Sequence, residues 1–291
     1  MLYSMTGYGR AEQSVNGKNF LIEVRSLNGK QFDIRLNMPP LLKPYEFEIR
    51  SALNEGFIRG SIECVITLKQ NGSVKPVSIN VDLVKAYYTP VAQLAKELNI
   101  GTNDILSTLL KLPDVISSSD EILSESEWID FQKVLNAAIT NLNTHRKEEG
   151  VSLENDLLQR IDNIEKQIPA IASLETKRRE KIKENIVKLL DDHVGKDNYD
   201  KNRLEQELIY YIEKIDISEE QVRLKNHCDY FKKILTETEV TKGKKLSFIL
   251  QEVGREINTT GSKAYDSDIQ KLVVSMKDEL EKAKEQVLNV L

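Results

Sequence analysis

Two stretches near the C-terminal end of the sequence carry acidic and basic side chains at helical spacing. In the first, Glu220, Arg223 and His227 follow at intervals of three and four residues, so on a helix they lie in a row along one face. In the second, Glu252 and Glu256 are four residues apart. Carboxylates and an imidazole one or two turns apart can share a divalent cation. Metal-assisted chemistry is therefore one function that this spacing allows.

Basic side chains accompany both rows. Arg255 and Lys263 stand near the carboxylates of the second stretch, and the segment Gly261-Ser262-Lys263 is predicted to end that helix. Phosphodiester hydrolysis needs such a mixture, because carboxylates hold a metal ion while arginine and lysine neutralise the phosphate. The alternative is that these residues form surface salt bridges of little energetic consequence, and that His227 is a packing or surface residue. The residue pattern alone favours this alternative.

Two amphipathic helices must position these side chains. The first is predicted to begin with Ser218 as its N-cap and Gln221 as the capping-box partner. The second is predicted over residues 244–260. Apolar residues at helical spacing face the core in both helices: Leu224, Cys228, Phe231 and Leu235 in the first, and Leu246, Ile249, Leu250, Val253 and Ile257 in the second.

The chain upstream of these helices divides by its hydrophobic pattern. Alternation with a period of two, as in Phe20, Ile22 and Val24, indicates half-buried strands in the first seventy residues. A helix is predicted over 45–57, a short strand over 77–81 and another helix over 82–98. From about residue 103 strand signals vanish and helical periodicity takes over. The sequence therefore predicts an α+β fold with three parts: a sheet-and-helix domain over 1–102, a middle region of long protruding helices over 103–204, and a C-terminal helical domain over 205–291.

Two long helices carry narrow apolar stripes. One helix is predicted to begin near Glu148 and to bend at Pro169, and the last helix of the chain is similar. The stripes comprise Leu157, Ile161, Ile164, Ile168 and Ile171 in one, and Ile269, Leu272, Val273, Met276, Leu280, Ala283, Val287 and Val290 in the other. Long stripes are often buried against another subunit, which predicts a homo-oligomer. The alternative is that one chain folds the two stripes against each other.

Composition excludes several classes of protein. A formal net charge of −5 argues against binding nucleic acid over the whole surface, but it allows a local basic groove. The chain has no apolar run long enough to span a membrane and no recognisable secretory signal, which predicts a cytoplasmic protein. Cys64 and Cys228 lie far apart and are predicted to be buried thiols. Motifs of P-loop enzymes, dinucleotide-binding proteins, serine hydrolases and zinc peptidases are absent.

Groups of residues at both ends of the chain resemble the YicC family. At the N-terminal end these are Met5-Thr6-Gly7-Tyr8-Gly9-Arg10-Ala11, Glu23-Val24-Arg25-Ser26-Leu27-Asn28 and Ile58-Arg59-Gly60. At the C-terminal end they are Ile217-Ser218-Glu219-Glu220, Arg223-Leu224, His227, Gly243-Lys244-Lys245-Leu246, Gln251-Glu252, Arg255-Glu256-Ile257-Asn258-Thr259, Gly261-Ser262-Lys263 and Glu285-Gln286-Val287. The resemblance covers roughly residues 1–155 and 205–291.

The resemblance implies a metal-dependent endoribonuclease with Mg or Mn as cofactor, acting in RNA turnover or small-RNA regulation and assembled as a homo-oligomer, a hexamer. The competing hypothesis is a non-catalytic RNA-binding adaptor that presents RNA to another nuclease. We assign the expected roles as follows. Catalytic residues are Glu252, Glu256, Arg255 and His227, and metal ligands are Glu219, Glu220, Glu252 and Glu256. RNA-binding residues are Arg10, Arg25, Asn28, Lys30, Arg59, Arg223 and Lys263, of which Arg10 and Asn28 are expected at strand ends. The basic clusters at Arg178-Arg179 and at Lys242, Lys244 and Lys245 are either phosphate contacts or solvated helix and loop.

Overall fold

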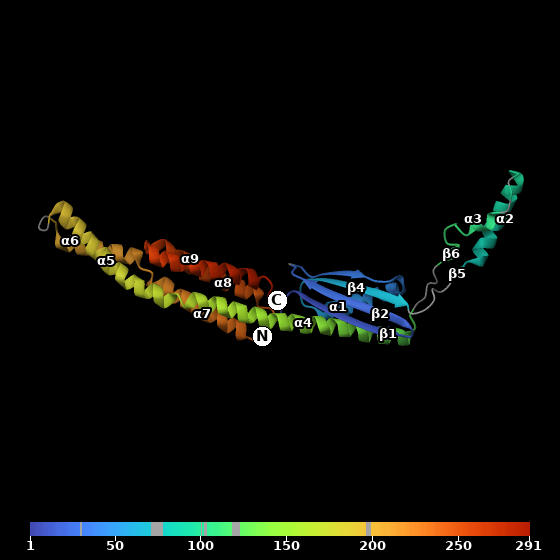
Figure 1. Ribbon diagram of the computed structural model, residues 1–291, viewed down its shortest axis with the longest axis horizontal. Helices are drawn as coiled ribbons and strands as arrows, with labels where there is room; N and C mark the ends of the chain where they lie inside the picture. Colours follow the sequence, from blue (N-terminus) through green and yellow to red (C-terminus); the bar gives the residue numbers. More distant parts are fainter. Residues whose placement is uncertain (30, 71–77, 100, 102–103, 118–122, 196–198) are drawn as a thin grey trace.

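The computed structural model is elongated, with a small sheet domain at one end of a long helical body (Figure 1). It describes residues 1–291 except 30, 71–77, 100, 102–103, 118–122 and 196–198. The sheet precedes the long helices in the chain, so the predicted α+β class is confirmed. Within the described residues, no helix is long and apolar enough to cross a membrane.

A four-stranded sheet forms the N-terminal domain. Its spatial order is β1 (Gly7–Val15), β2 (Lys18–Leu27), β4 (Ser61–Gln70) and β3 (Asp33–Asn37). Neighbouring strands are antiparallel except β3 and β4, which are parallel and are connected through η1 (Pro40–Tyr45) and α1 (Glu46–Gly56). The predicted alternation is confirmed, because Phe20, Ile22 and Val24 are fully buried while Arg25 on the opposite face is exposed.

Helix α4 (Glu125–Glu165) joins the sheet to the helical body (Figure 1). Its first half packs on the buried face of the sheet, and Phe131 and Leu142 belong to the core of the sheet. The expected start near Glu148 was wrong, because the helix begins at Glu125. Its N-cap is Ser124, which forms a capping box with Glu127 in the first turn. The expected bend at Pro169 is instead a break between α4 and α5 (Ile168–Val194), where the proline occupies the first turn of α5.

A small unit protrudes from the sheet domain (Figure 1). It contains β5 (Ser78–Ile79), α2 (Val81–Glu97), α3 (Ile105–Leu109) and β6 (Ile116–Ser117). The strand and the helix predicted over 77–98 are thus present, although residue 77 lies outside the described residues. The expected loss of strands after residue 103 was wrong for β6, which is only two residues long and pairs with β5.

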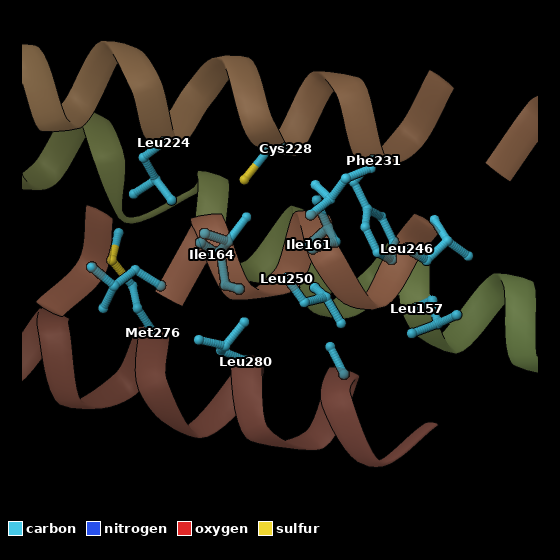
Figure 2. Packing of buried hydrophobic residues seen from close by; sticks show 14 of the residues in the cluster. Leu157, Ile161, Ile164, Leu224, Cys228, Phe231, Leu246, Leu250, Met276 and Leu280 are labelled. Atoms are coloured by element: carbon cyan, nitrogen blue, oxygen red, sulfur yellow. The ribbon is translucent and has the colours of Figure 1, made fainter. Parts of the chain in front are cut away.

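The helical body consists of the second half of α4 with α5, α6 (Lys201–Ile215), α7 (Ser218–Thr236), α8 (Gly243–Ala264) and α9 (Ser267–Val287). Figure 2 shows Ile161 and Ile164 of α4 in one core with Leu250 of α8 and Leu280 of α9. The two apolar stripes are therefore buried within the chain. The predicted need for a second subunit to cover them was wrong, and the alternative of intrachain packing is confirmed.

The two ends of the chain meet at the junction between the sheet domain and the helical body. Ser4 forms a β-bridge with Val290, and the amide of Leu291 donates to Tyr3 O over 2.9 Å. Buried Arg146 donates from Nη2 to Met5 O and Arg59 O, each over 3.1 Å. The N-terminal segment is therefore a structural joint between β1, α4 and the end of α9.

Both cysteines are buried, as predicted. Burial raises the pKa of the Cys64 thiol to about 12 and is the main cause that raises the pKa of Cys228 to about 12. These thiols stay protonated at neutral pH and are part of the packing, since the thiolate is the reactive form.

Candidate functional site

Helices α7 and α8 carry most of the predicted site residues and pack against each other in opposite directions. Lys263, in the last turn of α8, contacts Glu220, in the first turn of α7, with 2.7 Å between Nζ and Oε1. The same ammonium donates to Asp216 O over 3.1 Å. The Glu220 side chain is only 6% exposed, and the Lys263 side chain 34%. The structure therefore brings together two residues that the sequence assigned separately to metal and to RNA.

The Glu220–Lys263 contact also shows which residues of α7 and α8 lie opposite each other along the two helix axes. His227 lies seven residues after Glu220, and Glu256 lies seven residues before Lys263. Seven residues are about two turns and roughly 10 Å along a helix. Because α7 and α8 run in opposite directions, His227 and Glu256 lie at the same level, two turns from the ion pair. We call Glu220, His227, Glu252, Glu256 and Lys263 the α7–α8 polar row.

The three glutamates of the polar row differ in solvent exposure. Glu220 and Glu256 are each 5% exposed. Oε2 of Glu220 is buried without a hydrogen-bond partner among the described residues. Glu256 makes no ion pair or hydrogen bond with them either, but its carboxylate oxygens are not among the buried unpaired atoms, so they remain accessible. Glu252 is exposed, and its contact with Arg255 is long, 3.9 Å. The row thus presents the exposed carboxylate of Glu252 beside two largely buried residues, and of these two only Glu220 has a buried oxygen without a partner among the described residues.

The four predicted metal ligands do not form a metal site within one chain. Among the residues that the structure describes, no group of three or more His, Cys, Asp or Glu side chains could hold an ion. Glu219 is exposed and is paired with Arg223, and Glu220 is paired with Lys263. A closed cage of protein ligands therefore does not fit these residues.

A cluster of charges that the sequence did not reveal lies beside the ion pair. Arg178 and Arg179 of α5, predicted as exposed helix or phosphate contacts, bind Glu175 of the same helix, with 2.8 Å from each Nε to a carboxylate oxygen. Arg179 also reaches Asp216, which lies just before α7. Burial would raise the pKa of Asp216, but hydrogen bonds from Ser218 and the charge of Arg179 lower it below its ordinary value overall.

Asp216 also explains how α7 begins. Its Oδ1 accepts from the Ser218 amide over 2.8 Å and from the Ser218 hydroxyl over 2.7 Å. Ser218 is the first helical residue and Ile217 is the N-cap, so the predicted Ser218–Gln221 capping box was wrong. The segment Gly261-Ser262-Lys263 lies inside α8, not beyond its end as predicted, because α8 continues to Ala264.

The RNA-binding residues predicted in the N-terminal domain lie on the sheet and its edges, apart from the polar row. Arg10 is exposed, but it lies within β1 and not at a strand end as predicted, and it pairs with Glu12. Arg25 stacks over Tyr8, with its Cζ 5.8 Å from the ring centroid. Asn28 follows β2 as predicted, and it donates to Leu288 O over 2.8 Å.

Arg59 and Lys30 are the two remaining predicted RNA contacts of the N-terminal domain. Arg59 is half-buried, and its carbonyl accepts from Arg146. Lys30 lies outside the described residues. Of the lysines at 242, 244 and 245, Lys242 is fully buried, and its Nζ donates to Leu235 O over 2.8 Å at the end of α7. Lys242 therefore caps a helix and is not available to a phosphate.

Comparisons with known proteins cover the whole chain. A family model described as "Endoribonuclease YicC-like, N-terminal region" matches residues 2–155, and one described as "Endoribonuclease YicC-like, C-terminal" matches residues 164–291. A protein of Clostridioides difficile (strain 630) named "Probable endoribonuclease YicC" is 32% identical over 297 residues. A protein of Haemophilus influenzae with the same name is 28% identical over 293 residues. Both alignments span 100% of this chain and 100% of the relative.

Proposed function

The chain belongs to the YicC-like endoribonuclease family, and from this premise we propose that it is a metal-dependent endoribonuclease whose cleavage site is the α7–α8 polar row. The observation that carries the choice of site is the burial of Glu220 and Glu256, each 5% exposed. Burying a carboxylate costs free energy unless it is well paired. Oε2 of Glu220 is buried without such a partner among the described residues. Glu256 is largely buried and unpaired among them, but its carboxylate oxygens stay accessible, as a proton acceptor that must meet RNA requires.

In the proposed mechanism the side chains of the row have separate tasks. Glu256, with His227 at the same level, accepts the proton of the attacking oxygen, and His227 can return a proton to the leaving oxygen. Lys263, Arg223 and Arg255 bind the phosphate and stabilise its added negative charge. Arg223 and Arg255 are exposed and can turn from Glu219 and Glu252 toward RNA. The attacking oxygen is either water or the RNA 2′-hydroxyl, and analysis of the product ends distinguishes them.

A divalent cation, Mg or Mn, belongs to the proposal as an ion that arrives with RNA phosphates. Magnesium is commonly held by one or two carboxylates together with water and substrate phosphates. Glu219 at the start of α7 and Glu252 on α8 are exposed, but they lie about three turns apart along the helix pair, so each would meet a separate ion. When bound, the ion supplies charge stabilisation at the phosphate. The steps assigned above to the side chains do not depend on its geometry.

RNA would reach the row across the sheet domain in this proposal. Arg10, Arg25, Asn28 and Arg59 line strands and strand ends there, and Lys30 adjoins them in sequence. Their contacts would be with phosphates and riboses, which position a nucleic acid without specifying its sequence. This surface would hold the RNA while the α7–α8 polar row cleaves it, in RNA turnover or small-RNA regulation.

The first test measures cleavage of a labelled structured RNA by the purified protein. Mg or Mn is expected to support cleavage, and a chelator is expected to abolish it while RNA binding persists. An intact RNA in the presence of either ion, with binding retained, would contradict the enzyme and favour the alternative, a non-catalytic RNA-binding adaptor. A protein that also fails to bind RNA at low salt would contradict both hypotheses, because phosphate contacts are strongest there.

We also propose that the protein forms a homo-oligomer, a hexamer, through the protruding α2 unit. Helix α2 buries only Ala95, while Tyr88, Leu94 and Leu98 are each more than half exposed. Exposed apolar groups of this kind often mark interaction sites. We expect the double variant Tyr88→Ser, Leu94→Ser to have a lower molar mass by light scattering, and Gln93→Ser on the same helix to behave as the unchanged protein. An unchanged protein that is monomeric at micromolar concentration would contradict the proposal.

A further inference from the structure

Arg178, which is buried, and Arg179, which is partly exposed, lie on α5 where three segments of the helical body converge. Arg178 donates from Nη1 to Lys263 O over 3.0 Å and also contacts Ala264 O, at the end of α8. Its Nη2 donates to Ile215 O over 2.7 Å, at the end of α6. The last carbonyls of a helix have no partner inside the helix and attract cations. One guanidinium therefore holds the ends of α6 and α8 together.

Arg179 connects the same helix to the start of α7. It contacts Asp216, and its Nη2 lies 3.1 Å from Ser218 Oγ. Asp216 in turn accepts the Lys263 ammonium at its backbone oxygen. A continuous series of contacts thus runs from Arg179 through Asp216 to Lys263, and from Lys263 to Glu220 in the polar row.

Glu175 completes the cluster, because it contacts both guanidinium groups. The side chains of Glu175 and Arg178 are 6% and 4% exposed. A buried ion pair is weak evidence for a stabilising role, since apolar residues of similar volume often give equal or greater stability. An arginine has a planar set of hydrogen-bond donors, which an apolar residue lacks. These donors can hold several acceptors in one geometry.

We propose that Arg178 and Arg179 of α5 are positioning residues for Lys263, so that the placement of α5 sets the geometry of the polar row. Arg178 fixes the backbone that carries Lys263, and Arg179 fixes the loop that receives its ammonium. The proposal rests on the proposed function, because Lys263 is assigned there to the phosphate. A shift of α5 would reach Lys263 through these two contacts, without any contact between α5 and RNA.

The test uses Arg179→Gln and Arg178→Met in the full chain, with Lys177→Gln on the exposed face of α5 as the control. The first readout is the acetylation rate of Lys263 by acetic anhydride, followed by mass spectrometry under folded conditions. Loss of Arg179 or Arg178 is expected to increase this rate several-fold. The control is expected to leave it unchanged, and Arg179→Lys is expected to restore part of the protection.

The second readout separates kcat from KM for RNA cleavage. Misplacing a phosphate-binding group is expected to lower kcat at least about tenfold with little change in KM. The Arg179 side chain is 33% exposed, so Arg179→Gln keeps the test valid if Arg178→Met fails to fold. Equal Lys263 acetylation in all folded variants would overturn the proposal. If the unchanged protein cleaves no RNA, the proposed function falls, and the acetylation rates still decide whether the arginines position Lys263.

Discussion

Replacing Gly9 by alanine is expected to lower the free energy of unfolding by roughly 3 kcal/mol, the upper part of the usual range for overpacking a core. A Cβ atom at Gly9 would lie 2.2 Å from Ala138 O and 2.6 Å from Leu142 N. Both are backbone atoms of α4, so no side chain can turn away to make room. Either β1 or the first half of α4 must move, and α4 continues into the helical body.

Urea denaturation, followed by the fluorescence of Trp128, measures this loss. Trp128 is the single tryptophan of the chain, and its ring stacks on Tyr45 at 4.1 Å beside the core of the sheet. The matched control is Gly101→Ala, because a Cβ there meets nothing within 4 Å. That variant is expected to stay within about 0.5 kcal/mol of the unchanged protein. Equal losses for the two variants would show that β1 and α4 can separate at little cost.

The sheet and the C-terminal helices could be predicted from the sequence because each buries only one face. The period-two pattern around Phe20 and the helical stripe that includes Leu250 both appear in the structure with the expected faces buried. The start of α4 was missed although Ser124 and Glu127 carry the signal of a capping box. Between Leu142 and Leu153 the buried positions of this helix are held by Arg146 and Gly150, so its apolar pattern is interrupted where the sheet domain meets the helical body.

The beginning of α7 shows why a local signal can mislead. A serine before an amphipathic stretch is a favoured N-cap, and Ser218 has that place in the sequence. In the structure its hydroxyl donates to Asp216 and so does not cap the helix. Asp216 is held in turn by Arg179, which is 37 residues distant in the sequence. A spacing rule over four residues cannot include a partner at that distance.

The sequence predicted which residues of the candidate site share a helix face, but not their burial, because burial depends on segments distant in the sequence. Helical spacing placed Glu252 and Glu256 on one flank, but it could not show that one is exposed and the other buried, because that depends on packing against α7. The segment around Arg178 has the composition of an exposed helix. Arg178 itself is buried because the ends of α6 and α8, which lie far from it in sequence, bring their free carbonyls to it.

Replacing Glu256 by glutamine is expected to lower kcat for RNA cleavage at least about 100-fold, within the usual range for removing a general base. Glutamine keeps the shape of the side chain and removes its charge and its ability to accept the proton. RNA affinity is expected to stay within a few-fold, since the predicted phosphate contacts remain. Single-turnover cleavage and filter binding measure the two effects separately.

The matched variants are Glu252→Gln in the same row and Glu281→Gln on α9, whose carboxylate is exposed and paired with Lys284. Glu281→Gln is expected to change nothing. Glu252→Gln is expected to lower cleavage and to recover in part as the Mn concentration rises, because this carboxylate is assigned to the ion. Glu256→Gln is expected not to recover. Full activity of Glu256→Gln would remove Glu256 from the mechanism.

The stability of Glu256→Gln distinguishes a catalytic role from a structural one. A buried carboxylate that supports the fold is paired, and its loss leaves a partner unsatisfied and the protein less stable. Glu256 has no such partner among the described residues, so its neutral analogue is expected to unfold at the same or a higher urea concentration. A variant that loses activity while keeping or gaining stability would place Glu256 in the cleavage reaction, since residues that function requires are commonly retained at a cost in stability.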